Sequence, residues 1–427
     1  SASFLAPAAP SRSSVSFLFV MLGIRPLILV VCLFGASICL NGCGNDPAPS
    51  PSPPPSPTNK TTAIVMRHCA RSMPENGISD VAGFSFFDNY STDAWPAFKQ
   101  PAWYCLSRGE KIIEDEGRWF KAHGSLPTPV AVIADDCERD FVTGQAFLRG
   151  LGLTVDNTTF LTDPGPFNAV ESSTDCPELS AADWKATLEA QFAAYPPPDP
   201  QLMGRISEVV GVGAAGLWNA TPCALDLQSQ KKDPWAPYKG ACQAVSQFAE
   251  RFLMEEGGGM PTGWGRVSSA DIPTLLALQS YYFTVTLNAP RLVATTQASI
   301  AWAILRVLEA GEAGTKVFAG HDTQLGGLNS AMGLTWHPSP FPANGTMPGS
   351  ALRFDREGDM VTVSFGFVEN FTNSGDMKFV PASLPGATAG KISLGQLRTL
   401  VERSFVAGCA NGALARSHVK DLVEFVV

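Results

Sequence analysis

The chain contains little charge and no excess of basic residues. Charged residues make up 16% of its 427 residues, and the formal net charge is −9 at pH 7. Proteins that bind nucleic acids present a basic patch or stripe, so this composition argues against a nucleic-acid partner. A local basic pocket can still exist on an acidic surface, which leaves an anionic small molecule open as a substrate.

Cysteine spacing gives no sign of a zinc site, because the sequence has no Cys-x-x-Cys pair. The seven cysteines beyond Cys43 are Cys69, Cys105, Cys137, Cys176, Cys223, Cys242 and Cys409. An odd number leaves at least one thiol unpaired within the chain. Cys223 and Cys242 are close enough in sequence to close a local loop, and a Cys176–Cys409 bond would tie the middle of the chain to its C-terminal part.

The apolar run within the first 60 residues is short for a membrane-spanning helix, and an uncleaved anchor helix is the less favoured alternative to a signal peptide. The apolar stretch 26–40 follows Arg25 and is typical of a signal peptide, so residues 1–42 are expected to be an upstream extension and a signal peptide. Leu40-Asn41-Gly42-Cys43 is similar to a bacterial lipoprotein cleavage box, with Cys43 as the lipid anchor. Residues 43–60 read as a Pro/Ser-rich linker.

These features indicate a secreted, periplasmic or cell-envelope protein in an oxidising compartment. Asn-x-Ser/Thr sequons occur at Asn59, Asn89, Asn157, Asn219, Asn344 and Asn370. If they are used, they imply a eukaryotic secretory route. A bacterial lipoprotein and a glycosylated eukaryotic secreted protein therefore both remain open.

Beyond the linker, strands and helices alternate. Residues 61–66 and 130–134 have strand character, and each is followed by a helical pattern, at 108–123 and 141–151. Such alternation predicts an α/β fold with parallel strands. Residues 61–164 and 290–427 are expected to form this core, with a helix over 295–310 and later strands at 316–320 and 360–368.

The middle of the chain has a different character. Residues 165–289 are helical in pattern, with apolar residues at helical spacing over 181–194, 242–254 and 272–287. We therefore predict a helical cap inserted into the α/β core.

Two of the predicted strands end in a histidine with charged neighbours. Arg67-His68-x-x-Arg71 follows one apolar run, and His321-Asp322 follows another. Ligands of open α/β sheets bind at the carboxyl ends of strands, so the two segments could meet in one crevice. Histidine can attack phosphorus, guanidinium groups can clamp phosphate oxygens, and a carboxyl group can protonate the leaving alkoxide.

A third strand end adds an acid and a further cation. The run 130–134 is followed by Asp135 and then Arg139, which could supply another phosphate contact. Each segment alone has an ordinary structural explanation, as a solvated basic turn or a helix cap. The convergence of three strand ends on the parts of one reaction favours the chemical interpretation.

With these residues in view, the chain resembles the histidine acid phosphatase family, especially its bacterial phytase and glucose-1-phosphatase members. The similarity runs in order from about residue 62 to residue 425. The matching segments include Arg67-His68-Cys69-Ala70-Arg71, Asp93-Ala94-Trp95-Pro96, Leu106-Ser107-Arg108-Gly109, Thr143-Gly144-Gln145-Ala146-Phe147, Gly263-Trp264-Gly265-Arg266 and His321-Asp322-Thr323.

The resemblance implies a fold and a set of roles. The fold would be a Rossmann-like mixed sheet flanked by helices, with a helical cap domain inserted. His68 would form a phosphohistidine and Asp322 would supply the proton. Phosphate-binding residues would be Arg67, Arg71, Arg139 and His321, and substrate-binding acids would be Asp135 and Glu250. No metal or other cofactor is expected, and the protein would be a monomer or a weak homo-oligomer.

Some positions depart from the family pattern. Cys69 replaces the usual Gly after the histidine, and it could pair with Cys137 beside the phosphate-binding residues. Gln324 replaces an Asn. The stretch 72–75 lacks the Lys of phytases, and an Arg expected near 294–296 is missing, with Arg291 the nearest candidate. Fewer cations favour a substrate with one phosphate.

The main hypothesis is an acid phosphatase that hydrolyses phosphomonoesters, such as phytate or sugar phosphates. An intramolecular phosphate mutase is a second hypothesis, which the signal peptide and the cap disfavour. A third is a cell-surface phosphate-ester binding protein with weakened catalysis. Cys69 motivates this third hypothesis, and the intact His68 and Asp322 argue against it.

Overall fold

The computed structural model of the protein describes residues 60–73, 91, 93–167, 186, 189–190, 192–194, 198–211, 224–225, 238–239, 241–287, 297–371 and 376–405. The chain divides into two compact units, 1–54 and 55–427, and all of the described residues belong to the second. Within this part of the chain, no helix is both long and apolar enough to cross a bilayer.

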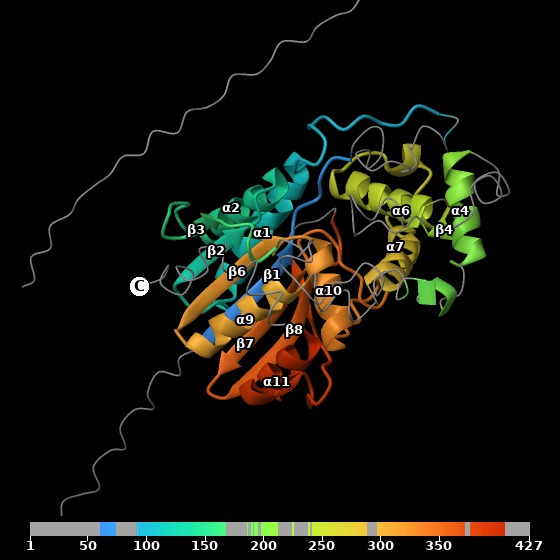
Figure 1. Ribbon diagram of the computed structural model, residues 1–427. Helices are drawn as coiled ribbons and strands as arrows, with labels where there is room; N and C mark the ends of the chain where they lie inside the picture. The colour runs from blue at the N-terminus through green and yellow to red at the C-terminus, as the bar shows by residue number, and fades with distance from the viewer. Residues whose placement is uncertain are drawn as a thin grey trace, which may run out of the picture. The chain divides into compact units, whose positions relative to one another are not determined.

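A mixed sheet of eight strands forms the centre of the second unit (Figure 1). Its strands are β1 (Lys60–Arg67), β2 (Val130–Ala134), β3 (Phe160–Thr162), β6 (Gly314–Gly320), β7 (Ala351–Glu357), β8 (Met360–Val368), β9 (Met377–Pro381) and β10 (Lys391–Ser393). The order is β10-β8-β7-β1-β6-β2-β3, with β9 paired to β8. The half containing β1, β6, β2 and β3 is parallel, and the half beyond β7 is antiparallel. The predicted α/β class and mixed sheet are confirmed.

Helices cover both faces of this sheet. They are α1 (Ser107–Ala122), α2 (Glu138–Leu151), α9 (Ala298–Ala310), α10 (Asp322–Met332) and α11 (Leu394–Ser404). Successive side chains of a strand point to opposite faces, so Arg353 and Arg356 of β7 project to different sides. The Arg353 guanidinium lies 5.9 Å from the ring of Phe120 in α1, whereas Arg356 donates to the carbonyl of Leu308 in α9.

The first strand, β1, is the centre of the core. Its residues Ala63 to Met66 are all 0% exposed, because β6 and β7 flank them and helices cover both faces. The parallel register places Arg67 opposite Gly320 of β6, and Ala134 of β2 opposite Ala319. The carboxyl ends of β1, β6 and β2 therefore lie at the same level.

A smaller set of helices lies between β3 and α9 in the sequence. It contains α4 (Pro200–Val210), α6 (Ala241–Gly257), α7 (Ile272–Leu287) and the short hairpin of β4 (Ala224–Leu225) and β5 (Tyr238–Lys239). The helices α6 and α7 pack against each other along buried apolar residues such as Phe252 and Leu275. The helices predicted over 242–254 and 272–287 are present, and most of the predicted helix 181–194 lies outside the described residues.

One buried acid of the core creates a pH-dependent stability. Glu116 of α1 is 0% exposed, and neither carboxylate oxygen has a hydrogen-bond partner among the described residues. Burial raises the pKa of Glu116 well above its ordinary value, with a smaller contribution from Asp115. The folded protein therefore holds this proton to a higher pH than the unfolded chain does, and stability falls as the pH rises above the unfolded pKa.

We expect Glu116→Gln to stabilise the protein by about 1 kcal/mol or more at pH 8 and by little at pH 4. Urea unfolding at both pH values measures the difference. The exposed Glu402 of α11 provides the control Glu402→Gln, which should change neither value. An equal effect of Glu116→Gln at the two pH values would contradict the assignment.

Candidate active site

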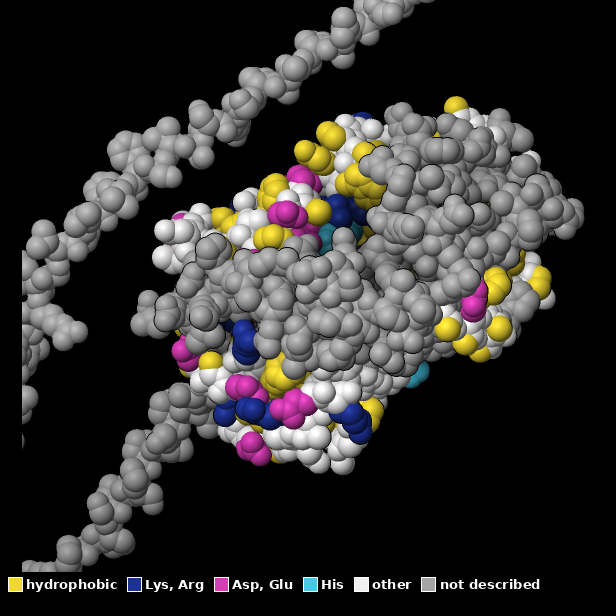
Figure 2. Space-filling model, in the orientation of Figure 1, with side chains coloured by type: hydrophobic (Ala, Val, Ile, Leu, Met, Phe, Trp, Pro, Cys, Tyr) yellow, Lys and Arg dark blue, Asp and Glu magenta, His cyan; other side chains and the backbone are white. Residues whose placement is uncertain are grey.

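The site is built where three parallel strands end. The backbone N–H of His68 donates to the carbonyl of Gly320 (2.8 Å), and that of Asp135 donates to the carbonyl of Ala319 (3.1 Å). His321 follows β6 directly and is the N-cap of α10. The rings of His68 and His321 consequently lie with their centroids 5.5 Å apart. Figure 2 shows a hollow on this face of the molecule in which Lys or Arg and His side chains gather.

His68 is a neutral imidazole with one nitrogen available. Its Nδ1 lies 2.8 Å from the carbonyl oxygen of Cys69. A carbonyl oxygen can only accept a hydrogen bond, so Nδ1 carries the proton and Nε2 keeps its lone pair. Burial, and then the positive charges of Arg139, Arg67 and Arg71, lower the pKa of His68 well below its ordinary value. The arrangement therefore maintains a nucleophilic nitrogen in acidic solution.

Arg67 is completely buried and held by two carboxylates. Its guanidinium lies 2.5 Å from Glu250 Oε1 and 2.8 Å from Asp322 Oδ2, and it also donates to the carbonyl of Thr346. The other oxygen of Glu250 accepts from the Gln279 side chain on α7. Glu250 lies on α6, so this ion pair joins the smaller helical region to the end of β1.

Arg71 and Arg139 complete a group of basic side chains. Arg71 Nη2 lies 3.3 Å from Glu250 Oε1, and Arg139 Nη2 lies 3.3 Å from His321 Nδ1. Burial is the main cause that lowers the pKa of Arg71 to about 10, so this guanidinium remains charged at neutral and acidic pH. Both guanidinium groups lie against the ring of Trp103, at 4.6 Å and 5.8 Å from its centroid.

His321 is held by two acids on the far side of its ring. Its Nε2 lies 3.0 Å from Asp135 Oδ2 and 3.5 Å from Asp140 Oδ2. Burial alone would lower the pKa of His321, but Asp140, Asp135 and Cys137 together raise it to about 9. Nε2–H donates to Asp135, and Nδ1 accepts from the guanidinium of Arg139, which can only donate. The raised pKa means that the carboxylates favour the imidazolium, which forms when Nδ1 gains a proton.

The same cluster offers atoms that could hold a metal ion. Asp135, Cys137, Asp140 and His321 each provide one potential ligand atom, all within 4.8 Å of one another. Among the described residues, two of these carboxylates, Asp135 and Asp140, form ion pairs with His321 Nε2.

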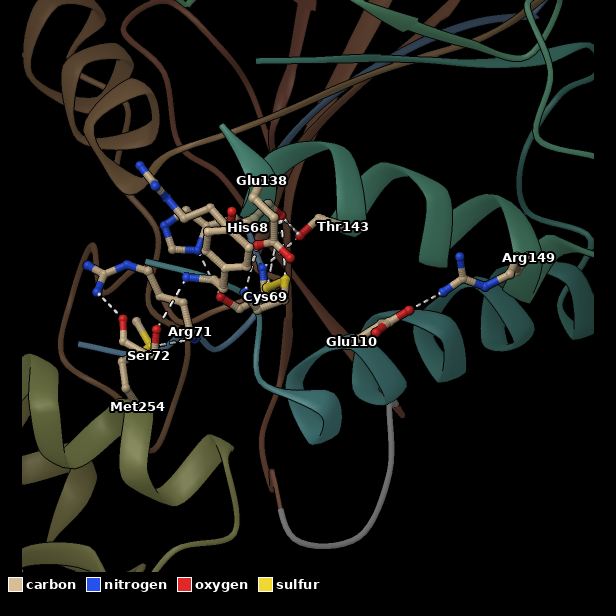
Figure 3. The surroundings of a disulfide bond; sticks show 12 residues. His68, Cys69, Arg71, Ser72, Glu110, Glu138, Thr143, Arg149 and Met254 are labelled. Atoms are coloured by element: carbon tan, nitrogen blue, oxygen red, sulfur yellow. Dashed lines mark hydrogen bonds and ion pairs between the residues drawn. A yellow bond between two sulfur atoms is a disulfide. The ribbon is translucent and has the colours of Figure 1, made fainter. Parts of the chain in front are cut away.

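The prediction that Cys69 pairs with Cys137 is wrong. Cys69 forms a disulfide with Cys105, and Cys137 is free. The segments 69–72 and 103–106 run antiparallel, and Arg71 forms a β-bridge with Cys105. This pairing brings the Cα atoms of Cys69 and Cys105 to 5.9 Å from each other. Figure 3 shows this bond beside His68, with Thr143 accepting from the backbone N–H of Cys69 (2.8 Å).

The structure brings together the eight residues that the resemblance implies for the site, which are Arg67, His68, Arg71, Asp135, Arg139, Glu250, His321 and Asp322. Glu250 and Asp135, which were expected to bind substrate, each contact a basic side chain of the site. Glu250 pairs with Arg67, and Asp135 pairs with His321. The position of Arg291, and the proposed pairs Cys223–Cys242 and Cys176–Cys409, lie outside the residues whose side chains are described.

Sequence reasoning missed several residues that support the site: Trp103, Cys105, Asp140, Thr143 and Gln279. Asp140 and Thr143 had a usable signal, since they lie one and four residues after Arg139 in the first turns of α2. The spacing of four lets Thr143 Oγ1 donate to the carbonyl of Arg139 at 2.6 Å. Trp103 had none, because its contacts depend on a loop conformation.

We expect Asp140→Asn to lower the pKa of His321, because it removes the negative charge of a carboxylate 3.5 Å from Nε2. Titration of the histidine ring signals by NMR should show the change, with the His321 midpoint moving down from about 9. Asp136→Asn is the control on a more exposed neighbouring acid and should move it less. An unchanged midpoint in Asp140→Asn would exclude this role.

Comparison with known proteins finds phytases. No family model matches the chain. Phytase AppA of Escherichia coli (strain K12) is 25% identical over 342 residues, covering 70% of this chain and 76% of that protein. A Hafnia alvei phytase solved in complex with myo-inositol hexakis sulphate shares the fold, with a TM-score of 0.68 and 22% identity over 83% of this chain and 99% of that chain. A Citrobacter braakii phytase has a TM-score of 0.66 and 22% sequence identity, covering 82% of this chain and 98% of that chain.

The structural likeness establishes the fold, and the sequence similarity extends to a phytase. His68 and His321 lie at neighbouring strand ends of that fold, as the motifs predict. Taken together, the motifs, the shared fold and the sequence similarity to a phytase support the histidine acid phosphatase family for this chain.

Proposed function

We propose that the protein hydrolyses phosphomonoesters through a phosphohistidine at His68. One observation supports this most directly: the hydrogen bond from His68 Nδ1 to the carbonyl of Cys69 leaves Nε2 free within a group of basic side chains. A nucleophilic nitrogen among fixed cations suits attack on a phosphate, because the cations offset the charge of the phosphate oxygens. The roles below belong to this proposal.

In the first step, the lone pair of His68 Nε2 attacks phosphorus while the bond to the ester oxygen breaks. Arg67, Arg71, Arg139 and the His321 imidazolium bind the phosphate oxygens. Asp322, a carboxylate beside Arg67 in the structure, binds a proton from solvent before this step. In that acid form it donates the proton to the leaving alkoxide, which departs as an alcohol. The products of this step are the phosphohistidine and the Asp322 carboxylate.

In the second step, water replaces the histidine on phosphorus. Asp322 takes a proton from the attacking water, and the bond between phosphorus and His68 Nε2 breaks. Inorganic phosphate leaves, and both side chains return to their starting protonation states. No redox change occurs, and the proposal needs no metal or other cofactor.

We propose that the substrates are phosphate esters of the phytate or sugar phosphate class, with esters of one phosphate preferred. The similarity to phytases supports the class. The preference rests on the segment after Arg71, where a basic residue is lacking. Met73 is buried there, with its sulfur 2.7 Å from Arg71 Nη1, so the place beside the site is filled by an apolar side chain.

We also propose that the protein works in an oxidising compartment, secreted or in the cell envelope. The Cys69–Cys105 disulfide supports this location, since such bonds persist mainly outside the cytosol. The stretch 26–60, with its apolar run, its Cys43 and its Pro/Ser-rich linker, supports export and a lipid anchor.

His68→Ala should lower the turnover of 4-nitrophenyl phosphate by at least about 10³-fold, because it removes the nitrogen that attacks phosphorus in the proposed mechanism. Phosphate release is the measurement. The control His337→Ala changes an exposed histidine far along the chain and should leave turnover unchanged. Retained turnover in His68→Ala would exclude the mechanism, and phosphate binding without turnover in the wild type would indicate a binding protein.

Asp322→Asn should slow an alkyl phosphate about 10²-fold or more, and 4-nitrophenyl phosphate much less. The reason is that 4-nitrophenolate leaves readily without a proton, whereas an alkoxide does not. Steady-state kcat values for the two substrates give the comparison, with the exposed Asp359→Asn as the control. Equal losses on both substrates would show that Asp322 is not the proton donor.

The substrate preference predicts that kcat/KM for glucose 1-phosphate is at least as high as for phytate. A phosphate-release assay with both esters at several acidic pH values provides the measurement. A preference for phytate of tenfold or more would contradict the proposed preference for esters of one phosphate.

A further inference from the structure

The basic side chains of the phosphate site are held in two different ways. Arg67 lies between Glu250 and Asp322, and His321 is held by Asp135 and Asp140. In both cases a carboxylate fixes the orientation of the cation. The same carboxylates also offset much of its positive charge, which reduces its attraction for a phosphate dianion.

Arg71 and Arg139 make fewer close contacts with carboxylates. The ion pair of Arg71 is with Glu250 at 3.3 Å, and this carboxylate lies closer to Arg67, at 2.5 Å. Arg139 forms no ion pair with any residue in the described part of the chain, and its Nε has no hydrogen-bond partner there. Both guanidinium groups instead face the ring of Trp103, at 4.6 Å and 5.8 Å.

Trp103 adopts a backbone conformation that is unusual for a residue with a side chain. Its φ is +71°, in the left-handed region that glycine favours. Such conformations persist where the surroundings impose them, and they are common at functional sites. Here the neighbouring backbone imposes it, since Trp103 N–H donates to Ser72 O (3.3 Å) and Ser72 N–H donates to Tyr104 O (2.8 Å).

The segment around Trp103 is also anchored to both arginine-bearing parts of the chain. The Cys69–Cys105 disulfide ties it to the loop that follows β1 and carries Arg71. The N–H of Cys105 donates to Glu138 Oε2 (2.9 Å), which lies next to Arg139 in α2. The indole ring is thereby fixed between two guanidinium groups from different segments.

We propose that Trp103 is a positioning residue of the phosphate site, which orients Arg71 and Arg139 through its ring face while leaving their positive charge available to the substrate. The negative face of an indole attracts a cation without carrying a net charge, so it holds a guanidinium without neutralising it. This inference rests on the proposed function for its catalytic meaning. Its direct consequence concerns the affinity for inorganic phosphate.

The decisive comparison is between Trp103→Phe and Trp103→Leu. Both variants place a side chain at the same positive φ and both keep apolar bulk, but only Phe keeps an aromatic face. Titration calorimetry with inorganic phosphate on the purified full chain should show binding about five- to thirtyfold weaker in Trp103→Leu than in the wild type. Binding in Trp103→Phe should stay within about threefold of the wild type.

Trp264 provides a matched control. It too has a positive φ, of 60°, and its ring faces an arginine, Arg266, at 5.0 Å. Its other ring contact among the described residues is with Trp95, at 4.2 Å. Trp264→Leu should therefore leave phosphate affinity unchanged. In kinetics with 4-nitrophenyl phosphate, Trp103→Leu should raise KM more than it lowers kcat.

Equal phosphate affinities of Trp103→Phe and Trp103→Leu would overturn the inference, as would a wild type that does not bind phosphate or an equal loss in Trp264→Leu. Thermal unfolding shows whether each variant is folded. If Trp103→Leu is misfolded, the phosphate affinity of Trp103→Phe decides the question, since weak phosphate binding by a folded Trp103→Phe also contradicts the inference. Failure of the proposed function is a separate result: the wild type would release no phosphate from any ester, while the calorimetric comparison would still decide the role of Trp103.

Discussion

The parallel pairing of β1 with β6 determines where the two histidines of the site, His68 and His321, lie. The strands end at Arg67 and Gly320, which lie opposite each other, and the residues that follow them are His68 and His321. The hydrogen bond from the N–H of His68 to the carbonyl of Gly320 extends the ladder of the two strands to this point. A slip of one residue would turn His68 to the other face of the sheet. The buried apolar stretch of β1 prevents such a slip, since it would expose side chains that are now 0% accessible. The register of β1 therefore fixes both the burial of its apolar side chains and the position of His68.

Charge at the site is arranged in layers. The cations that would meet the phosphate are Arg67, Arg71, Arg139 and His321, and behind most of them lies a carboxylate or an aromatic ring. These supports come from different parts of the chain: Glu250 from α6, Asp140 from α2 and Trp103 from the loop before α1. Because the supports are fixed before any anion arrives, little rearrangement is needed on binding, which is the condition for strong electrostatic catalysis. Burial, and then the same cations, lower the pKa of His68, so the charges that bind the phosphate also help to keep the nucleophile neutral.

Much of this organisation could be predicted from the sequence, for identifiable reasons. The runs 61–66 and 130–134 are apolar throughout and end abruptly in charge, so both the strands and the polar ends are evident. The strand β7 was not predicted, because Arg353, Asp355 and Arg356 interrupt its apolar pattern. Arg353 and Asp355 pair with each other, and the two arginines also donate to carbonyls distant in sequence, those of Ser125 and Leu308. The disulfide partner of Cys69 and the place of Trp103 were equally inaccessible, since both follow from an antiparallel contact of two loops that carries no periodic signal. Local patterns predicted the catalytic groups, and long-range loop contacts supplied their supports.

The disulfide links two loops that both border the nucleophile, so its formation is part of building the site and not only of strengthening the fold. The hydrogen bonds of β1 with β6 and β7 do not depend on it, because the bond lies beyond the end of the strand. A chain synthesised under reducing conditions can therefore form its sheet while the two loops beside His68 are not joined to each other. Production of the protein for any biochemical use should accordingly take place in an oxidising compartment of the host, because solubility and secondary structure alone would not reveal an incomplete site.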